Sequence, residues 1–580
     1  MTDETTSGTT ASTPPAGTGG ARDGRITRLT SDDALFVVME RVLGVPVTNQ
    51  LIWRLPAPQE DAAGDRAGDP AGDDHAAGAR SATGADGRAR HGARPVDDAA
   101  VAELGAALRR GRLARLVRRS HGPTRDRWVY DAGAGLVRTG LPTVPAGGEG
   151  RWIRDQLRLR LDSVAGPAWA LTTAPTADGG RLVSLSFSHV IADGLGAVTA
   201  VAEALTGREA EAALPAGPGP TVAASLRDAA SLVGDAAVSA VRLVRSSLRA
   251  GRGGTGDDGA AEGGTAEAAP HTAASPSVPA AAADDSADSP AAALSAADAS
   301  TPRTDSPAVA HPGLLPTIAV EVDGPRFAAA AASAGGTTNT LFAAVTLGVL
   351  AASGRVTDGE TVPVSLPVSL RGDHDLRANA TSGATAHVVV SPDRYTDLTP
   401  IRAASKAGFR RITAGEFSAV DAMTRIAQAL PDGVVRRLAG TASTPLCLAS
   451  NLGVVDPLFA SLGGPDQGRT AIRSVSVPDG AADVDTDGDT DGDAAADGGD
   501  GPAADGDTDG DAAADGGDGP AADGDLLRSG GISAWATLAG TRLSLCFTAL
   551  DTSLIPDEDR LTALVSAELD RWDVPATRWL

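Results

Sequence analysis

Four stretches of the chain consist almost entirely of Ala, Gly, Asp, Ser, Thr, Pro and scattered Arg, and they limit how much of it can fold. Such segments have too few large apolar side chains to form a core, so we expect them to be disordered. The remainder, about 400 of the 580 residues, is enough for two domains of roughly 200 residues each. We therefore predict an N-terminal lobe over 25–249 and a C-terminal lobe over 313–580. The disordered stretches are expected at 1–24, at 57–97 within the first lobe, at 250–312 between the lobes, and at 479–526 within the second lobe.

The net charge of −24 comes mostly from one of these stretches. Sixteen aspartates and no Lys or Arg lie between Asp483 and Asp525, and they account for two thirds of that charge. Because no dense basic face is found elsewhere, we expect no nucleic-acid partner. The only lysine, Lys406, does not stand in the Gly-Lys-Ser/Thr step of a phosphate-binding loop. Cys447 and Cys546 are predicted to be buried free thiols, and no Cys/His spacing indicates a metal site.

Neither a secretion signal nor a membrane span is visible in the sequence. The N-terminus is rich in Thr, Ser and Gly without an apolar core, and no charge-free run of about 18 apolar residues occurs. We therefore expect a cytoplasmic protein. A long helix predicted at 221–249 has a basic face, formed by Arg227, Arg242, Arg245 and Arg249. This pattern is typical of a solvated surface helix, and peripheral membrane contact is the lesser alternative.

Helical and strand-like segments alternate in both halves, which predicts an α/β or layered α+β fold with mixed sheets and packed helices. Helices are expected at 34–43, 101–117, 195–205, 221–249, 338–350, 400–438 and 557–572, with an Ala-rich helix before residue 338. Strands are expected at 50–55, 127–130, 152–161, 181–189, 317–322, 362–370, 387–390, 445–450 and 542–550. Pro363 and Pro367 place the 362–370 strand near a sheet edge or a bulge.

One segment carries side chains suited to catalysis, and it begins with the strand over 181–189. Strand alternation places Val183, Leu185, Phe187 and His189 on one face, so the imidazole stands at the end of a buried strand and before a helix. Asp193 follows four residues later. Gly194 is expected to allow a sharp turn of the backbone. A histidine held in this way can face a cleft, although a lone histidine is more often an ordinary surface or core residue.

The pattern His189-x-x-x-Asp193-Gly194 after a Ser-rich strand resembles the signature of the chloramphenicol-acetyltransferase-like superfamily. This group includes condensation domains, polyketide-associated acyltransferases and wax ester synthase/diacylglycerol acyltransferases. Further segments resemble motifs of the wax ester synthases, in the same order along the chain: 31–34 with Glu40, 338–345, 364–371 followed by Asn379, and 450–453. Three positions depart from the family pattern. Ser188 replaces the first of two histidines, Thr340 replaces an Asp after Asn339, and the Pro near Asn451 is missing.

This resemblance implies two lobes with an active-site channel between them, and an acyltransferase mechanism without metal or cofactor. His189 would act as a general base while a hydroxyl or amine acceptor attacks the thioester of an acyl-CoA or an acyl carrier protein. The acceptor would be a small molecule or a lipid, and the protein a monomer. Asp193 would be structural, paired with an arginine for which Arg371 is the candidate, although it could simply cap the helix that follows.

Asn339 and Asn451 are tentative substrate-binding residues, and Asn339 could equally be a helix cap. The alternative function is a catalytically silent member of the same fold that binds acyl ligands or serves as a scaffold. A thioesterase-like hydrolase is disfavoured because the sequence lacks a G-x-S-x-G nucleophile elbow.

Overall fold

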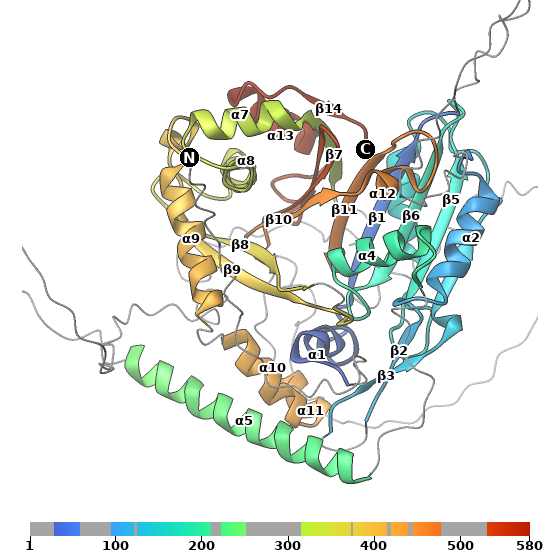
Figure 1. Cartoon of the computed structure of the whole chain (residues 1–580). Coiled ribbons are helices and arrows are strands. Elements are labelled where there is room, and N and C mark those ends of the chain that lie inside the picture. The colour runs from blue at the N-terminus through green and yellow to red at the C-terminus, as the bar shows by residue number, and fades with distance from the viewer. Residues whose placement is uncertain are drawn as a thin grey trace, which may run out of the picture.

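The chain folds around two mixed β-sheets, as a computed structural model shows (Figure 1). The structure describes residues 28–58, 94–120, 124–209, 222–250, 315–372, 375–414, 419–438, 445–476 and 530–580. The four stretches predicted to be disordered lie outside these residues, apart from 57, 58, 94–97 and 250. The predicted mixed α/β class, with two sheets and packed helices, is confirmed.

The N-terminal sheet has five strands in the order β11-β1-β6-β5-β4. They are β11 (Arg469–Ser476), β1 (Val47–Leu55), β6 (Arg181–Ser188), β5 (Trp169–Pro175) and β4 (Gly135–Arg138). The predicted alternation in β6 holds, because Val183, Leu185 and Phe187 share one apolar core cluster. Two helices pack against one another beside this sheet, α2 (Asp98–Leu108) and α4 (Gly194–Leu205).

The C-terminal sheet has seven strands in the order β14-β7-β13-β12-β10-β8-β9. They are β14 (Ala576–Arg578), β7 (Thr317–Asp323), β13 (Arg542–Ala549), β12 (Ile532–Ala539), β10 (Cys447–Val455), β8 (Thr361–Ser369) and β9 (Thr381–Val389). Its core is built on α8 (Thr338–Ala352), whose residues from Thr340 to Leu350 are all buried. This helix packs against β10 and β12, and it contacts α7 (Gly324–Ser333), α9 (Thr399–Thr413) and α13 (Glu558–Arg571). The predicted near-edge position of β8 is confirmed, since only β9 lies outside it.

Strand β11 crosses from the C-terminal half of the chain into the N-terminal sheet. It pairs with β1 along its whole length, from Arg54↔Arg469 to Val47↔Ser476. The short helix α12 (Pro457–Ser461) before it packs against α4. The region 457–476 is therefore an exception to the predicted division of the chain at 250–312. The physical reason is that β1 would otherwise expose an unpaired edge.

Two predicted elements are wrong. The helix expected at 101–117 ends at Leu108, and the chain turns into β2 (Arg115–Arg118), which pairs with β3 (Arg127–Tyr130). The strand expected at 152–161 is instead helix α3 (Glu149–Asp155) followed by a 3₁₀ turn (Gln156–Arg158). The alternation of charged and apolar side chains suggested a strand, but the same residues also have a helical spacing. Ile153 and Leu157, four residues apart, are both buried.

The remaining helices lie along one side of the molecule (Figure 1). Helix α1 (Ser31–Val37) continues as a π-helix (Val38–Val42), and α5 (Val222–Ala250) packs against α10 (Ala419–Ala429), which precedes α11 (Asp432–Leu438). The outer side of α5 exposes Arg227, Arg242 and Arg245, together with apolar side chains such as Leu226 and Val244. Membrane contact through α5 stays a prediction. Within the described residues, only α7 and α8 taken as a pair reach the length and apolarity of a membrane span, and they are bent by 87°.

Candidate active site

His189 lies directly after the last residue of β6, between the two sheets. Its backbone N–H donates to the carbonyl of Val47 at 2.8 Å, which ties the end of β6 to the start of β1. The imidazole stacks on the ring of Phe36 from α1, with 3.7 Å between the ring centroids and 16° between the planes. The side chain keeps part of its surface exposed. It is thus held on one face without being sealed into the core.

Asn379, on the segment between β8 and β9, fixes the tautomer of this imidazole. Its Nδ2 donates to the carboxylate of Asp33 at 3.1 Å and to the backbone carbonyls of His189 and Val190 at 3.0 and 3.1 Å. Because these three partners can only accept, the amide oxygen must face the other way, toward His189 Nδ1 at 3.0 Å. That oxygen can only accept, so Nδ1 carries a proton, and in the neutral ring the lone pair is on Nε2.

Burial lowers the pKa of His189, an effect only partly offset by the negative charge of Asp193 and by the contact with Asn379. The imidazole is therefore neutral at pH 7. A neutral ring with its free lone pair on Nε2 has the protonation state that a general base requires.

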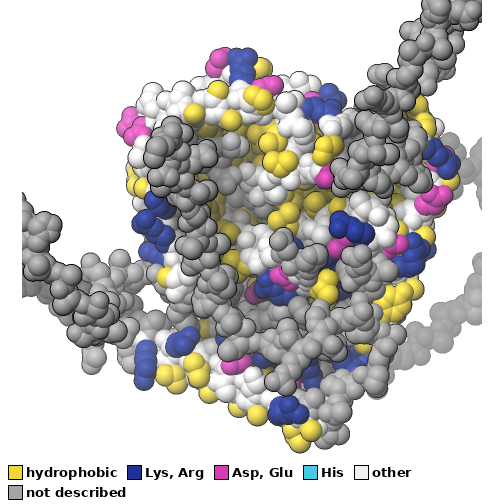
Figure 2. Space-filling model, viewed as in Figure 1, with side chains coloured by type: hydrophobic (Ala, Val, Ile, Leu, Met, Phe, Trp, Pro, Cys, Tyr) yellow, Lys and Arg dark blue, Asp and Glu magenta, His cyan; other side chains and the backbone are white. Residues whose placement is uncertain are grey.

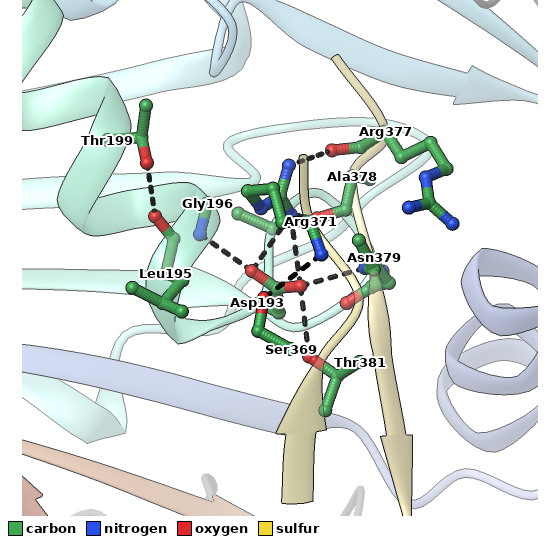
Figure 3. Close-up of polar contacts among 12 residues, drawn as sticks. Asp193, Leu195, Gly196, Thr199, Ser369, Arg371, Arg377, Ala378, Asn379 and Thr381 are labelled. Atoms are coloured by element: carbon green, nitrogen blue, oxygen red, sulfur yellow. Dashed lines mark hydrogen bonds and ion pairs between the residues drawn. The ribbon is translucent and has the colours of Figure 1, made fainter. Parts of the chain in front are cut away.

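Asp193 anchors the loop that follows His189 (Figure 3). Arg371 Nη2 donates to both carboxylate oxygens at 3.0 Å, and this ion pair is almost completely enclosed. The backbone N–H groups of Gly196 and Ala380 donate to the same carboxylate at 2.6 and 2.8 Å. Burial by itself raises the pKa of Asp193, but Arg371 and these backbone donors hold it below its usual value. The helix cap and the ion pair considered from the sequence are thus both present, on one carboxylate.

Gly194 is not required for a turn. It is the first residue of α4 and does not have a positive φ. A Cβ at this position would lie 3.0 Å from Ile472 Cδ1 and 3.2 Å from Leu452 Cδ2. The expected sharp turn is therefore corrected to a close approach, because two strands of the C-terminal half press against the start of α4.

Two buried arginines of the N-terminal lobe reach across to the segment that carries Asn379. Arg112 pairs with Glu203 of α4 and donates to the carbonyl of Asp375, while Arg115 donates to the carbonyl of Leu376. Burial lowers the pKa of Arg115 to about 10, which leaves it charged at pH 7. These contacts join the loops of the two lobes around His189.

Three further residues of the site were missed in the sequence. Asn379, Asp33 and Glu40 appeared in the sequence only as parts of segments that resemble motifs of the wax ester synthases. The structure makes Thr30 the cap and places one oxygen of Asp33 on the backbone N–H and side chain of Asn379. Glu40 accepts a hydrogen bond from the hydroxyl of Ser188 at 2.6 Å. Ser188 stands at the position where the motif that it resembles has the first of two histidines. Only the polar identity of these residues in apolar surroundings could have indicated their roles.

Asn339 and Asn451 lie together, but at a separate cavity. Asn451 Nδ2 donates to Asn339 Oδ1, and both line a cavity of about 540 Å³ in the C-terminal lobe. Its walls come from α8, β8, α9 and β10. His189 is not among its lining residues. The channel between the lobes that the resemblance implies stays a prediction.

Among the described residues, no group of three or more His, Cys, Asp and Glu side chains is placed to hold a metal ion. Cys447 and Cys546 are free and buried, which confirms the prediction for both thiols.

No protein-family model and no curated protein matches the chain. Its structure is similar to solved structures that include condensation domains and a wax ester synthase/diacylglycerol acyltransferase. Polyketide synthase associated protein 5 from Mycobacterium tuberculosis is 14% identical with a TM-score of 0.45, over 94% of this chain and 99% of that one. The first condensation domain of the CDA synthetase is 12% identical with a TM-score of 0.44, over 96% and 100%. The wax ester synthase/diacylglycerol acyltransferase from Marinobacter aquaeolei VT8 is 12% identical with a TM-score of 0.43, over 94% and 99%.

Proposed function

We propose that the protein is an acyltransferase in which His189 is the general base. The observation that supports this proposal is the hydrogen bond from His189 Nδ1 to Asn379, which in a neutral ring leaves the lone pair on Nε2. In the reaction, Nε2 accepts the proton of an acceptor hydroxyl or amine while the acceptor oxygen or nitrogen bonds to a thioester carbonyl carbon. The carbon–sulfur bond then breaks, and the departing thiolate takes the proton from the imidazolium. A positioned base of this kind contributes about 10²–10⁴-fold to the rate.

The remaining residues of the site would hold this base in place. Asp193 and Arg371 fix the loop after His189, and Phe36 limits rotation of the ring. A thioester is already activated, so the step as written needs no metal or cofactor beyond the acyl donor. Acyl-CoA or an acyl carrier protein is the proposed donor, and a small molecule or lipid is the proposed acceptor. The protein is proposed to be cytoplasmic and monomeric.

A second candidate is a catalytically silent protein that binds an acyl ligand or a synthase partner. The position of the described cavity favours it, because the cavity reaches Asn339 and Asn451 but His189 does not line it.

Intact-mass and product screening with a panel of acyl-CoA donors and hydroxyl and amine acceptors tests the first candidate. The wild-type protein should transfer the acyl group, and His189→Gln should lower the rate at least about 100-fold. The matched control is His387→Gln, because it makes the same substitution at a histidine on β9 instead of the histidine that follows β6. Equal transfer by wild type and His189→Gln would refute the mechanism. Ligand binding without any transfer would favour the silent protein.

A further inference from the structure

Helix α5 exposes a row of apolar residues along its outer side. Leu226, Val233 and Val244 are separated by seven and eleven residues, which are close to two and three helical turns, so they lie in one row about 27 Å long. These residues are 67%, 52% and 59% exposed. Apolar side chains gathered in this way mark an interaction surface, whereas single exposed ones are ordinary. The exposed residues of this apolar stripe are Leu226, Ala230, Val233, Ala237, Ala240 and Val244.

Three arginines flank one edge of the apolar stripe. Arg227 directly follows Leu226 and Arg245 directly follows Val244, so both lie on the same side of the row, and Arg242 lies a little further around the helix. All three arginines are exposed, and none of them forms an ion pair within the described part of the chain. Figure 2 shows apolar and basic side chains next to one another along the edge where α5 lies.

The carboxylates of α5 lie on its other side, where the helix meets the N-terminal lobe. The helix has only two, Asp228 and Asp235. Asp228 forms an ion pair with Arg28 at 3.1 Å and accepts from the backbone N–H of Arg125. Asp235 pairs with Arg125 at 3.4 Å, and Leu232 between the two aspartates is buried. The inner side thus holds α5 to the lobe, and the cations of the outer side have no carboxylate of their own helix left to pair with.

We propose that the outer side of α5 binds the surface of an anionic lipid bilayer. The apolar stripe enters the boundary between headgroups and acyl chains, and the three arginines lie among the lipid phosphates. Within the described residues, no single helix is long and apolar enough to cross a membrane, so α5 lies in the plane of the surface. The inference goes beyond the proposed function, because this binding requires no turnover.

A second copy of the chain fits this surface less well than a bilayer does. Two α5 helices packed along their apolar stripes would bring the three arginines of each helix together, while Asp228 and Asp235 are already paired. A bilayer needs no matching shape, and its anionic headgroups complement the arginines. The attraction depends on these local cations and not on the net charge of −24, because salt screens charges beyond about 8 Å.

Cosedimentation of the full chain with lipid vesicles tests the inference. One set of vesicles contains phosphatidylcholine alone, and the other contains equal parts of phosphatidylcholine and phosphatidylglycerol. The wild type should bind the anionic vesicles and hardly bind the neutral ones. The triple variant Arg227→Gln/Arg242→Gln/Arg245→Gln should bind the anionic vesicles roughly 100-fold more weakly, since each arginine near the surface contributes about tenfold or slightly less.

A second triple variant separates insertion of the apolar stripe from simple ionic adsorption. Leu226→Gln/Val233→Gln/Val244→Gln keeps the arginines and should still bind the anionic vesicles at least about tenfold more weakly. Because all these positions are exposed, the melting temperature of both variants should stay close to that of the wild type. The matched control removes three exposed arginines from β4, α9 and α13, as Arg138→Gln/Arg410→Gln/Arg560→Gln.

A dye on α5 reports insertion without removing any arginine. Cys447 and Cys546 are buried, so Val233→Cys supplies one exposed thiol for an environment-sensitive dye. Its emission should shift to the blue when anionic vesicles are added. The same dye on Ala352→Cys, at the exposed end of α8 and away from α5 (Figure 1), should not respond.

Weaker binding by both α5 variants, with the control variant unchanged and a blue shift confined to the dye on α5, would support the inference. An equal loss in the control variant, no effect of the apolar substitutions, or no blue shift would overturn it. Absence of binding of the wild type to anionic vesicles would also overturn it, and would leave the outer side of α5 to a protein partner.

Discussion

Replacing Arg371 by Met should destabilise the protein strongly, because it leaves the carboxylate of Asp193 buried without its cation. The side chains of Asp193 and Arg371 are only 4% and 8% exposed. Removing one partner of a buried ion pair costs about 3–5 kcal/mol. Asp193 keeps donors from Gly196, Ala380 and Thr381, so we expect a loss near the lower end, about 3 kcal/mol.

The loss of stability caused by Arg371→Met should become smaller as the pH falls. In the wild type the pKa of Asp193 is lowered, so its contribution to stability is present above the unfolded pKa and is lost as the pH falls through the folded pKa. In Arg371→Met, burial raises the pKa of Asp193 without compensation from the guanidinium. The difference in unfolding free energy between variant and wild type should therefore be largest at neutral pH and smaller in acid.

Urea denaturation at several pH values measures these free energies. The double variant Asp193→Asn/Arg371→Met lacks both charges of this pair and should recover about 1–2 kcal/mol relative to Arg371→Met. Arg326→Met is the control, because its partner Asp573 has a side chain that is 93% exposed, and stability should hardly change. A loss below about 1 kcal/mol for Arg371→Met, or a double variant no more stable than it, would refute the reasoning.

Further predictions concern the imidazole, the glycine and the thiols. Because burial lowers the pKa of His189, kcat/KM should fall in acid with a midpoint below 6.5, the ordinary histidine value; a midpoint above 7 in a pH–rate profile would contradict this. Gly194→Val should cost about 1–3 kcal/mol in denaturant titrations through contact with Ile472 and Leu452, and an effect no larger than that of Gly383→Val, where a Cβ meets nothing within 4 Å, would contradict it. Burial raises the pKa of both cysteine thiols to about 12, so a thiol reagent at pH 8 should titrate no thiol in the native protein and two in denaturant.

The sequence predicted well those elements whose pattern is local. Strand β6 and helix α4 have clear alternation and helical spacing, and both were found to within one residue of their observed ends. The α/β class followed from the alternation of helical and strand-like segments, and the two lobes from the low-complexity stretches and the family resemblance. The helix at 101–117 was predicted too long because further apolar residues, Leu113, Leu116 and Val117, follow Leu108, where the chain turns toward β2.

Long-range contacts could not be predicted from local patterns. Asn379 lies 190 residues from His189 in the chain, and β11 is separated from β1 by more than 400 residues, so no periodicity links them. The pairing of Asp193 with Arg371 was anticipated only through the family resemblance. The cavity beside α9 was not anticipated, because its lining residues on α8, β8, α9 and β10 come together only in the folded chain.

The most direct test of the account is the protonation state of His189 in the intact protein. Nitrogen-15 NMR of the histidine side chains, with the His189 signals assigned by their loss in His189→Gln, reports which ring nitrogen carries a proton. The account predicts, at pH 7, a neutral ring with its proton on Nδ1 and a free Nε2. A proton on Nε2, or a charged imidazolium at this pH, would contradict it.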